Sequence, residues 1–337
     1  MTQSEQNIRL FSTCPPSNAL SSSTYIQDVR RIAIWSELAG CEGILVYANN
    51  ALIDPWLTSQ VIITATSQLR PLVALQPIYM HPYTTAKMIS SIALLHHRQV
   101  HLNMLAGGFT SDLIALNDHT KHDERYVRLV EYTQIVQGLL RGETVTTDGG
   151  YYAVHNLKLA PSLPRELMPD VFVSGSSDAG MAAGRQLKAL AVEYPGPVSD
   201  YRTQTPAEAR GMRIGIVTRS REEDAWRIAR ERFPEDRKGQ ITHQLAMKMS
   251  DSSWHSQLSQ HDTGDENLDN NPYWLLPFKN YKTFCPYLVG SYERVARELA
   301  DYVDAGYRTF ILDVPESPEE LEHIRAVFKL VREGVLT

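Results

Sequence analysis

A run of small polar residues, Gly175-Ser176-Ser177-Asp178, follows a β-prone stretch and opens a predicted helix. Serine and aspartate side chains cap the free backbone N–H groups of a helix start. The same N–H groups, with the positive end of the helix dipole, can hold a phosphate. An ordinary cap and a phosphate site both fit Ser176 and Ser177, and the position after a strand favours phosphate if the fold is a barrel.

Asn103 lies in a predicted strand between Leu102 and Met104. A buried amide needs hydrogen-bond partners, and these can come from a heteroaromatic ring or from an internal group. Both interpretations stand. Ala48-Asn49-Asn50 is a second polar turn, placed directly after an earlier strand.

A dense polar cluster precedes another predicted helix and comprises His119, His122, Asp123, Glu124, Arg125 and Tyr126. Its spacing matches no helical metal motif, so we predict no metal site. The fork of an arginine is matched to phosphate oxygens, which makes Arg125 and Tyr126 candidate phosphate donors.

Arg213 stands between Met212 and Ile214, where a charge is costly unless it is paired. It can bind an anionic substrate or a peroxide, or it can form an internal ion pair. The sequence contains no Gly-x-Ser-x-Gly elbow, Walker loop or His-Glu-x-x-His motif, which argues against serine hydrolases, P-loop proteins and zinc proteases.

The elements that must position these residues alternate between β-rich runs and stretches with helical periodicity. The predicted strands are 8–12, 43–47, 71–75, 100–104, 171–174, 189–192, 212–217 and 309–312. The predicted helices are 24–39, 55–67, 84–95, 125–140, 179–186, 222–232, 291–305 and 318–332. Eight such units predict an α/β fold, a (β/α)8 TIM barrel. The first turn, 14–18, lacks glycine, which argues against a Rossmann dinucleotide site.

We predict a single barrel over residues 1–337 that carries two insertions. Residues 142–161, with Asp148-Gly149-Gly150, predict a hairpin. Residues 233–286, before the eighth strand, form the larger insertion and contain a helical piece at 240–249 and a polar stretch at 250–271. A long segment of this kind predicts an active-site lid.

The composition is that of a globular chain, with 43% hydrophobic residues, 21% charged residues and a net charge of -6. It argues against a nucleic-acid surface, and no signal or membrane-spanning pattern is present, so we expect a cytoplasmic protein. The 3 cysteines are far apart and predict neither a disulfide framework nor a zinc site.

Three runs, 100–107 (VHLNMLAG), 122–140 (HDERYVRLVEYTQIVQGLL) and 173–184 (VSGSSDAGMAAG), together resemble the FMN-dependent branch of the bacterial luciferase-like monooxygenases. The pyrimidine and alkanesulfonate monooxygenases are the most similar within it. The late run 288–299 (LVGSYERVAREL) is similar too.

The resemblance implies a two-component oxidoreductase. A separate NAD(P)H:flavin reductase delivers reduced FMN (FMNH2), and O2 adds to give a flavin peroxide that oxygenates a small organic substrate. It also implies a homodimer or homotetramer. The residues that it places around the flavoprotein's cofactor are Ala48, Asn49 and Asn103 at the ring, Asp112 nearby, and Arg125, Tyr126, Ser176 and Ser177 at the phosphate.

This chain differs from the pyrimidine and alkanesulfonate enzymes at several positions, and these differences bear on which substrate it uses. The pyrimidine enzymes carry a lysine and a threonine where this chain has Asn49 and Ala74. The alkanesulfonate enzymes carry a cysteine, a histidine and a tyrosine where it has Leu52, Gly215 and Pro315, although Arg213 is kept. Neither substrate follows from the sequence.

Our hypothesis is a monooxygenase in which Asn103 positions flavin and oxygen and Arg213 neutralises charge. The insertion would close over the site, with Lys279 or Lys282 as charge partners. A deazaflavin (F420)-dependent oxidoreductase on the same barrel and a non-catalytic flavin-binding barrel are the alternatives.

Overall fold

The computed structural model describes residues 8–19, 22–201, 209–248, 258 and 271–334. The chain divides into two compact units. Unit 1 contains Met1–Thr13, Trp35–Glu42 and Val192–Thr337, and unit 2 contains Cys14–Ile34 and Gly43–Ala191. Most of the predicted lid, 250–271, lies outside the described residues.

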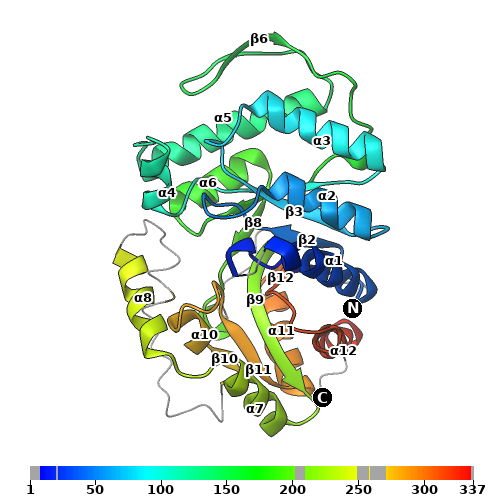
Figure 1. Ribbon diagram of the computed structural model, residues 1–337, viewed down its shortest axis with the longest axis vertical. Coiled ribbons are helices and arrows are strands. Elements are labelled where there is room, and N and C mark those ends of the chain that lie inside the picture. The colour runs from blue at the N-terminus through cyan, green and yellow to red at the C-terminus, as the bar shows by residue number, and fades with distance from the viewer. Residues whose placement is uncertain (1–7, 20–21, 202–208, 249–257, 259–270, 335–337) are drawn as a thin grey trace. The chain divides into compact units, whose positions relative to one another are not determined.

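Unit 2 is built on four parallel strands in the order β2-β3-β4-β7. Helices α3 and α5 pack against each other, as do α5 and α6 (Figure 1). The elements of this unit are β2 Gly43–Val46, α2 Pro55–Ala65, β3 Arg70–Leu75, α3 Pro82–His96, β4 His101–Met104, α4 Thr110–Ala115, α5 His122–Leu140, β5 Val145–Asp148, β6 Ala153–Leu157, β7 Val171–Ser174 and α6 Asp178–Leu187, with short 3-10 turns at Ser17–Ala19 and Arg165–Leu167.

Local capping signals fix the helix starts of unit 2. The Asp54 carboxylate accepts hydrogen bonds from the N–H groups of Trp56 and Leu57, and Pro55 occupies the first helical position of α2. Ser177 caps α6 in the same way. Between α5 and β7, strands β5 and β6 form a separate antiparallel pair within 142–161.

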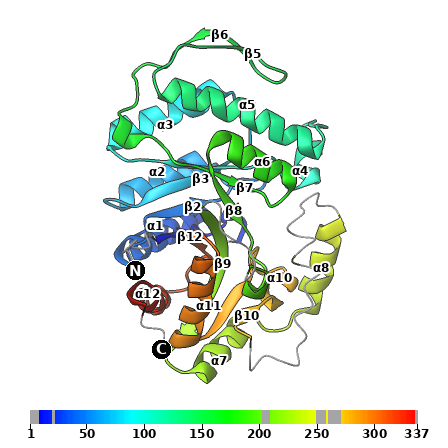
Figure 2. The same ribbon diagram turned by 180° about the vertical axis from the view of Figure 1, so that it is seen from behind.

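Unit 1 contains parallel pairs between β1 and β12, β12 and β9, and β9 and β8. Figure 2 shows α11 beside β9 and β11. Its elements are β1 Arg9–Thr13, β9 Arg210–Arg219, α7 Glu222–Arg232, α8 Arg237–Lys248, β10 Tyr273–Trp274, α10 Leu276–Lys279, β11 Tyr287–Ser291, α11 Tyr292–Asp304, β12 Tyr307–Leu312 and α12 Pro318–Glu333, with a 3-10 turn at Val198–Tyr201. Helix α1 Ser22–Leu38 and strand β8 Leu190–Glu193 cross the division between the units.

Strand β9 has 10 residues, against 6 in β12 and 5 in β11, and it pairs with these two strands in succession, besides its short pairing with β8. Residues 210–214 pair with β12, and residues 215–219 pair with β11, whose other side pairs with β10. The sequence predicted neither β10 nor β11. It did predict all eight strands β1, β2, β3, β4, β7, β8, β9 and β12, each of which overlaps its expected range.

Buried apolar residues account for the packing of each unit. In unit 2 one cluster runs from Trp56 through Tyr132 to Leu187 and joins the strands to α3, α5 and α6. In unit 1 a smaller cluster includes Trp226, Trp274 and Tyr287 and holds α7 against β9 and β11. No helix among the described residues is long and apolar enough to cross a membrane.

Candidate functional site

The hydroxyl of Tyr126 lies in a space that two glycines leave open. A Cβ at position 175 would lie 2.3 Å from the Tyr126 oxygen, and a Cβ at position 180 would lie 3.1 Å from it. Ser177 forms a side-chain hydrogen bond with this hydroxyl. Burial raises the pKa of Tyr126, while Ser177 and the nearby Arg125 charge oppose that shift, so the phenol stays protonated and able to donate at neutral pH.

Helix α6 begins at this cluster. Ser177 has extended backbone and accepts a 3.2 Å hydrogen bond from the N–H of Gly180. The neighbouring Ser176 hydroxyl oxygen is buried and, among the described residues, has no hydrogen-bond partner. A buried hydroxyl without a partner is costly. An orphan donor at a helix N-terminus, beside a buried phenol, suits a phosphate.

Arg125 and Tyr126 are the fourth and fifth residues of α5, and both are buried. A second buried pair fixes the segment that leads into this helix. The Arg128 guanidinium donates to the Asp118 carboxylate over 2.7 Å, and Thr120 donates to the same carboxylate over 2.6 Å through its hydroxyl. Burial alone would raise the pKa of Asp118, but the hydrogen bonds from Arg128 and Thr120 lower it to about 2.

Asn103 lies on β4 with Ala74 of β3 on one side and Phe172 of β7 on the other. Its side chain is almost completely buried. The Ser174 hydroxyl donates a 2.8 Å hydrogen bond to Asn103 Oδ1. The amide oxygen therefore has an internal partner, which leaves the amide nitrogen as the group that can face a ligand.

The turn after β2 is braced against α4. Asn50 donates through its side chain to the Asp112 carbonyl over 2.9 Å and through its backbone to the Asp112 carboxylate over 3.3 Å. Tyr79 donates to Asn50 over 3.1 Å. Burial and the Asp112 charge raise the pKa of Tyr79 to about 12. The Asn49 side chain turns back to the N–H of Ala51, and Ala48 is half-buried beside it.

These contacts bring together Arg125, Tyr126, Ser176 and Ser177 as one cluster. Ala48 and Asn49 follow β2, and Asp112 is braced to the next residue, Asn50. Asn103 joins β4 to β7. All eight residues belong to unit 2.

Arg213 belongs to unit 1 and is buried on β9. Its guanidinium lies 3.4 Å from the Asp313 carboxylate, so the internal ion pair considered from the sequence is present. Lys282, one of the two lysines predicted as charge partners, forms a 2.7 Å ion pair with Asp236.

Three residues that support the site escaped the sequence reasoning: Ser174, Tyr79 and Asp313. Asn50 belongs to the polar turn noted in the sequence but was not predicted as a site residue. Ser174 ends β7 and Asp313 directly follows β12, so a polar side chain at the end of a strand is the signal that could have found both. Nothing local marks Tyr79, since its partner Asn50 is distant in sequence.

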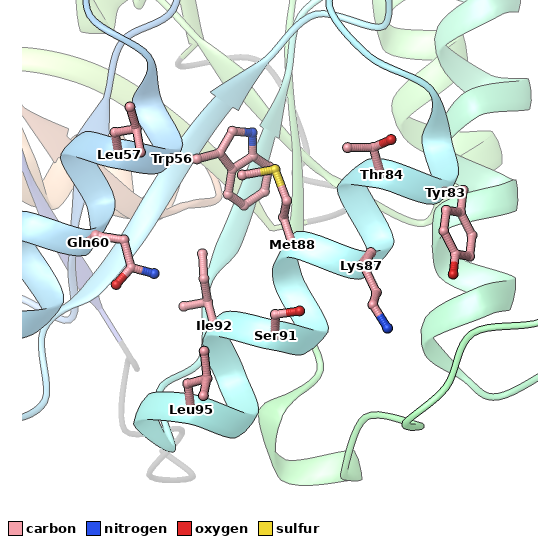
Figure 3. Close-up of a pocket in the computed structure, with 10 residues that line it drawn as sticks. All are labelled: Trp56, Leu57, Gln60, Tyr83, Thr84, Lys87, Met88, Ser91, Ile92 and Leu95. Atoms are coloured by element: carbon pink, nitrogen blue, oxygen red, sulfur yellow. The ribbon is translucent and has the colours of Figure 1, made fainter.

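An apolar groove lies elsewhere in unit 2, between α2 and α3 (Figure 3). The cavity measures about 370 Å³, and Figure 3 shows Met88 directed toward the ring of Trp56. Its lysine, Lys87, donates to the Ala160 carbonyl over 2.6 Å. The groove offers few convergent polar groups, so it lacks the character of a catalytic pocket.

Known proteins share both this sequence pattern and this fold. The model of the luciferase-like monooxygenase family matches residues 8–309. The 4-(gamma-L-glutamylamino)butanoyl-[BtrI acyl-carrier protein] monooxygenase BtrO of Niallia circulans is 35% identical over 320 residues, which are 92% of this chain and 92% of that protein.

Solved structures are similar over almost the whole chain. EDTA monooxygenase (EmoA) from Chelativorans sp. BNC1 superposes with a TM-score of 0.74 at 17% identity, covering 98% of this chain and 95% of that one. Long-chain alkane monooxygenase (LadA) gives 0.73 at 15% identity, covering 99% and 92%. The likeness confirms the predicted (β/α)8 barrel. The family model matches most of this chain, and BtrO is 35% identical to it. This chain therefore belongs to the luciferase-like monooxygenase family and is a monooxygenase of that family.

Proposed function

We propose that this chain is the oxygenating component of a two-component system, which receives reduced FMN from a separate flavin reductase and uses O2 to oxygenate a small organic substrate. Reduced FMN supplies two electrons, so that one atom of O2 enters the substrate and the other leaves as water.

The observation that carries the choice of FMN is the phosphate cradle, the cluster of Arg125, Tyr126, Ser176 and Ser177. It combines a buried guanidinium, a protonated phenol, an orphan hydroxyl and the start of α6. Each of these groups is a hydrogen-bond donor or can act as one, as a phosphate monoester requires. The hydrogen bond between Tyr126 and Ser177 and the effect of the Arg125 charge on Tyr126 support their acting together.

The remaining residues would orient the flavin and neutralise charge on the substrate. Asn103, whose amide oxygen is held by Ser174, would bind the flavin through its amide nitrogen. Asn50 and Asp112 fix the turn that carries Ala48 and Asn49. Arg213 offers positive charge to the substrate or to the developing product.

The first substrate class to test is an acyl group bound as a thioester to a carrier protein. This proposal rests on the similarity to BtrO, whose name states that its substrate is attached to an acyl-carrier protein. The chain departs from the pyrimidine and alkanesulfonate enzymes at Asn49, Leu52 and Gly215, which supports a different substrate.

The test is product analysis under 18O2 with FMN, NAD(P)H and a flavin reductase, using acyl groups both as carrier-protein thioesters and as free acids. We expect one 18O atom in the product and no product without the reductase. Turnover with reduced deazaflavin and no use of oxygen would replace the proposal with the F420 alternative. Flavin binding without any product would support the non-catalytic barrel.

A binding comparison tests the cradle separately. Riboflavin lacks the phosphate and is expected to bind at least about tenfold more weakly than FMN, a difference of about 1.4 kcal/mol. In Ser176→Ala and Tyr126→Phe the FMN affinity should fall toward that of riboflavin, whose own affinity should change little. An equal loss for both ligands would contradict a phosphate site.

A further inference from the structure

A single partly buried carboxylate bonds to three side chains in unit 1. Asp313 is the first residue after β12. Its Oδ2 accepts a 2.9 Å hydrogen bond from the Tyr287 hydroxyl, and its Oδ1 lies 3.4 Å from the Arg213 guanidinium. The Cys285 thiol forms a third hydrogen bond with it.

Strand register places this group at the carboxyl ends of two strands. Arg213 pairs with Ile311, next to the last residue of β12. The preceding residue of β9, Met212, pairs with Glu193, the last residue of β8. Substrate-binding groups of (β/α)8 barrels come from this end of the strands.

Gly215 is a glycine because the ring of Tyr287 covers it. The two residues are register partners across β9 and β11. A Cβ at position 215 would lie 2.2 to 2.5 Å from atoms of the Tyr287 ring, closer than real side chains approach. The place where β9 would present a side chain, a histidine in the alkanesulfonate enzymes, is filled here by a phenol from β11.

Neighbouring groups hold the phenol and the carboxylate in place. The Phe233 ring packs edge-on against Tyr287 with centroids 5.0 Å apart. The Arg232 guanidinium lies 5.8 Å from the Tyr287 ring centre and donates over 3.0 Å to the carbonyl of Val314, the residue after Asp313. The phenol of Tyr287 and the backbone next to Asp313 are thus fixed from a second side.

We propose that Asp313 and Tyr287 are positioning residues that set the orientation of Arg213, and that Tyr287 replaces the side chain missing at Gly215. The inference rests on the proposed function, because it assigns to Arg213 the charge that meets the substrate. Asp313 fixes the guanidinium through one oxygen and the phenol through the other, so that the three side chains act as one unit.

The experiment compares Tyr287→Phe, Asp313→Asn and their double variant with the wild-type enzyme. Tyr292→Phe is the matched control, since this tyrosine of α11 bonds to His323 outside the cluster. We expect Tyr287→Phe to lower kcat/KM about tenfold and Asp313→Asn to lower it further, with more H2O2 released per product. The double variant should lose little more than Asp313→Asn alone, because coupled residues are not additive.

Thermal unfolding of the wild type, the two single variants and the double variant gives a readout that needs no substrate. The shifts in Tm for Tyr287→Phe and Asp313→Asn should also fall short of additivity. Additive shifts, or single variants with wild-type kcat, KM and H2O2 release, would overturn the inference. If the wild-type enzyme oxygenates no substrate, the proposed function fails. The Tm shifts of the single and double variants still decide whether Tyr287 and Asp313 form one unit.

Discussion

The Ser174 hydroxyl donates a 2.8 Å hydrogen bond to Asn103 Oδ1 and so fixes which end of the Asn103 amide is available to a ligand. A residue on β7 thereby determines the chemistry that a residue on β4 can perform.

The first prediction concerns this pair. Asn103→Ala is expected to lower kcat/KM by at least about tenfold, in the lower part of the range for loss of a preorganised donor. Ser174→Ala should have a smaller effect, about threefold to tenfold, because one neutral hydrogen bond contributes about 1 kcal/mol. Steady-state kinetics on both variants check this order, and a larger loss for Ser174→Ala would contradict it.

The second prediction uses two glycines near the same helix. Gly175→Ala places a Cβ 2.3 Å from the Tyr126 hydroxyl and should weaken FMN binding at least about tenfold. Gly184→Ala is the control, since its Cβ would meet no atom within 4 Å and alanine favours a helix. Fluorescence titration with FMN gives both affinities, and unchanged binding by Gly175→Ala would rule out a role for the Tyr126 hydroxyl.

The third prediction is a pH dependence that arises from Asp118. Its folded-state pKa is lowered to about 2, so the stability that it contributes is fully present above its unfolded pKa and is lost as the pH falls toward 2. Asp118→Asn leaves Arg128 buried without its carboxylate and should cost about 3 to 5 kcal/mol at pH 7. Urea unfolding at pH 7 and pH 3 should show the gap between wild type and variant narrowing, whereas a constant gap would refute this role.

The fourth prediction concerns Arg232 and Glu320, which form a 2.6 Å ion pair between α7 and α12. Burial already raises the pKa of Glu320. In Arg232→Met that pKa should rise further, so the folded state would hold a proton that the unfolded state releases. The variant should therefore lose stability as the pH rises from 5 to 8. Adding Glu320→Gln should remove this pH dependence; its persistence in the double variant would assign it to another group.

The sequence predicted what depends on local signals. Ser177 was expected at a helix start because capping preferences act within one turn, and it caps α6. The eight strands follow from short apolar runs between helices. Helix α4 was missed because it has six residues and no side-chain cap. Strand β11 was missed because it follows Pro286 and contains Gly290, both of which weaken a strand pattern.

The partners of the candidate residues had no such signal. Asn103 meets Ser174 because β4 and β7 are neighbours, although 71 positions separate them. Arg213 meets Asp313 across 100 positions through the register of β9 with β12. A sequence pattern identifies a residue that needs a partner, but the pairing of strands decides which partner it receives.

The double pairing of β9 limits how far the insertion can be shortened. If β11 were removed, residues 215–219 would become an uncovered edge strand with unpaired backbone groups and the apolar side chains of Ile216 and Val217. Such an edge recruits other chains and leads to aggregation. Truncated proteins that keep 271–291 should stay monodisperse in light scattering, whereas those that cut into this stretch should precipitate even when every residue of the phosphate cradle is intact.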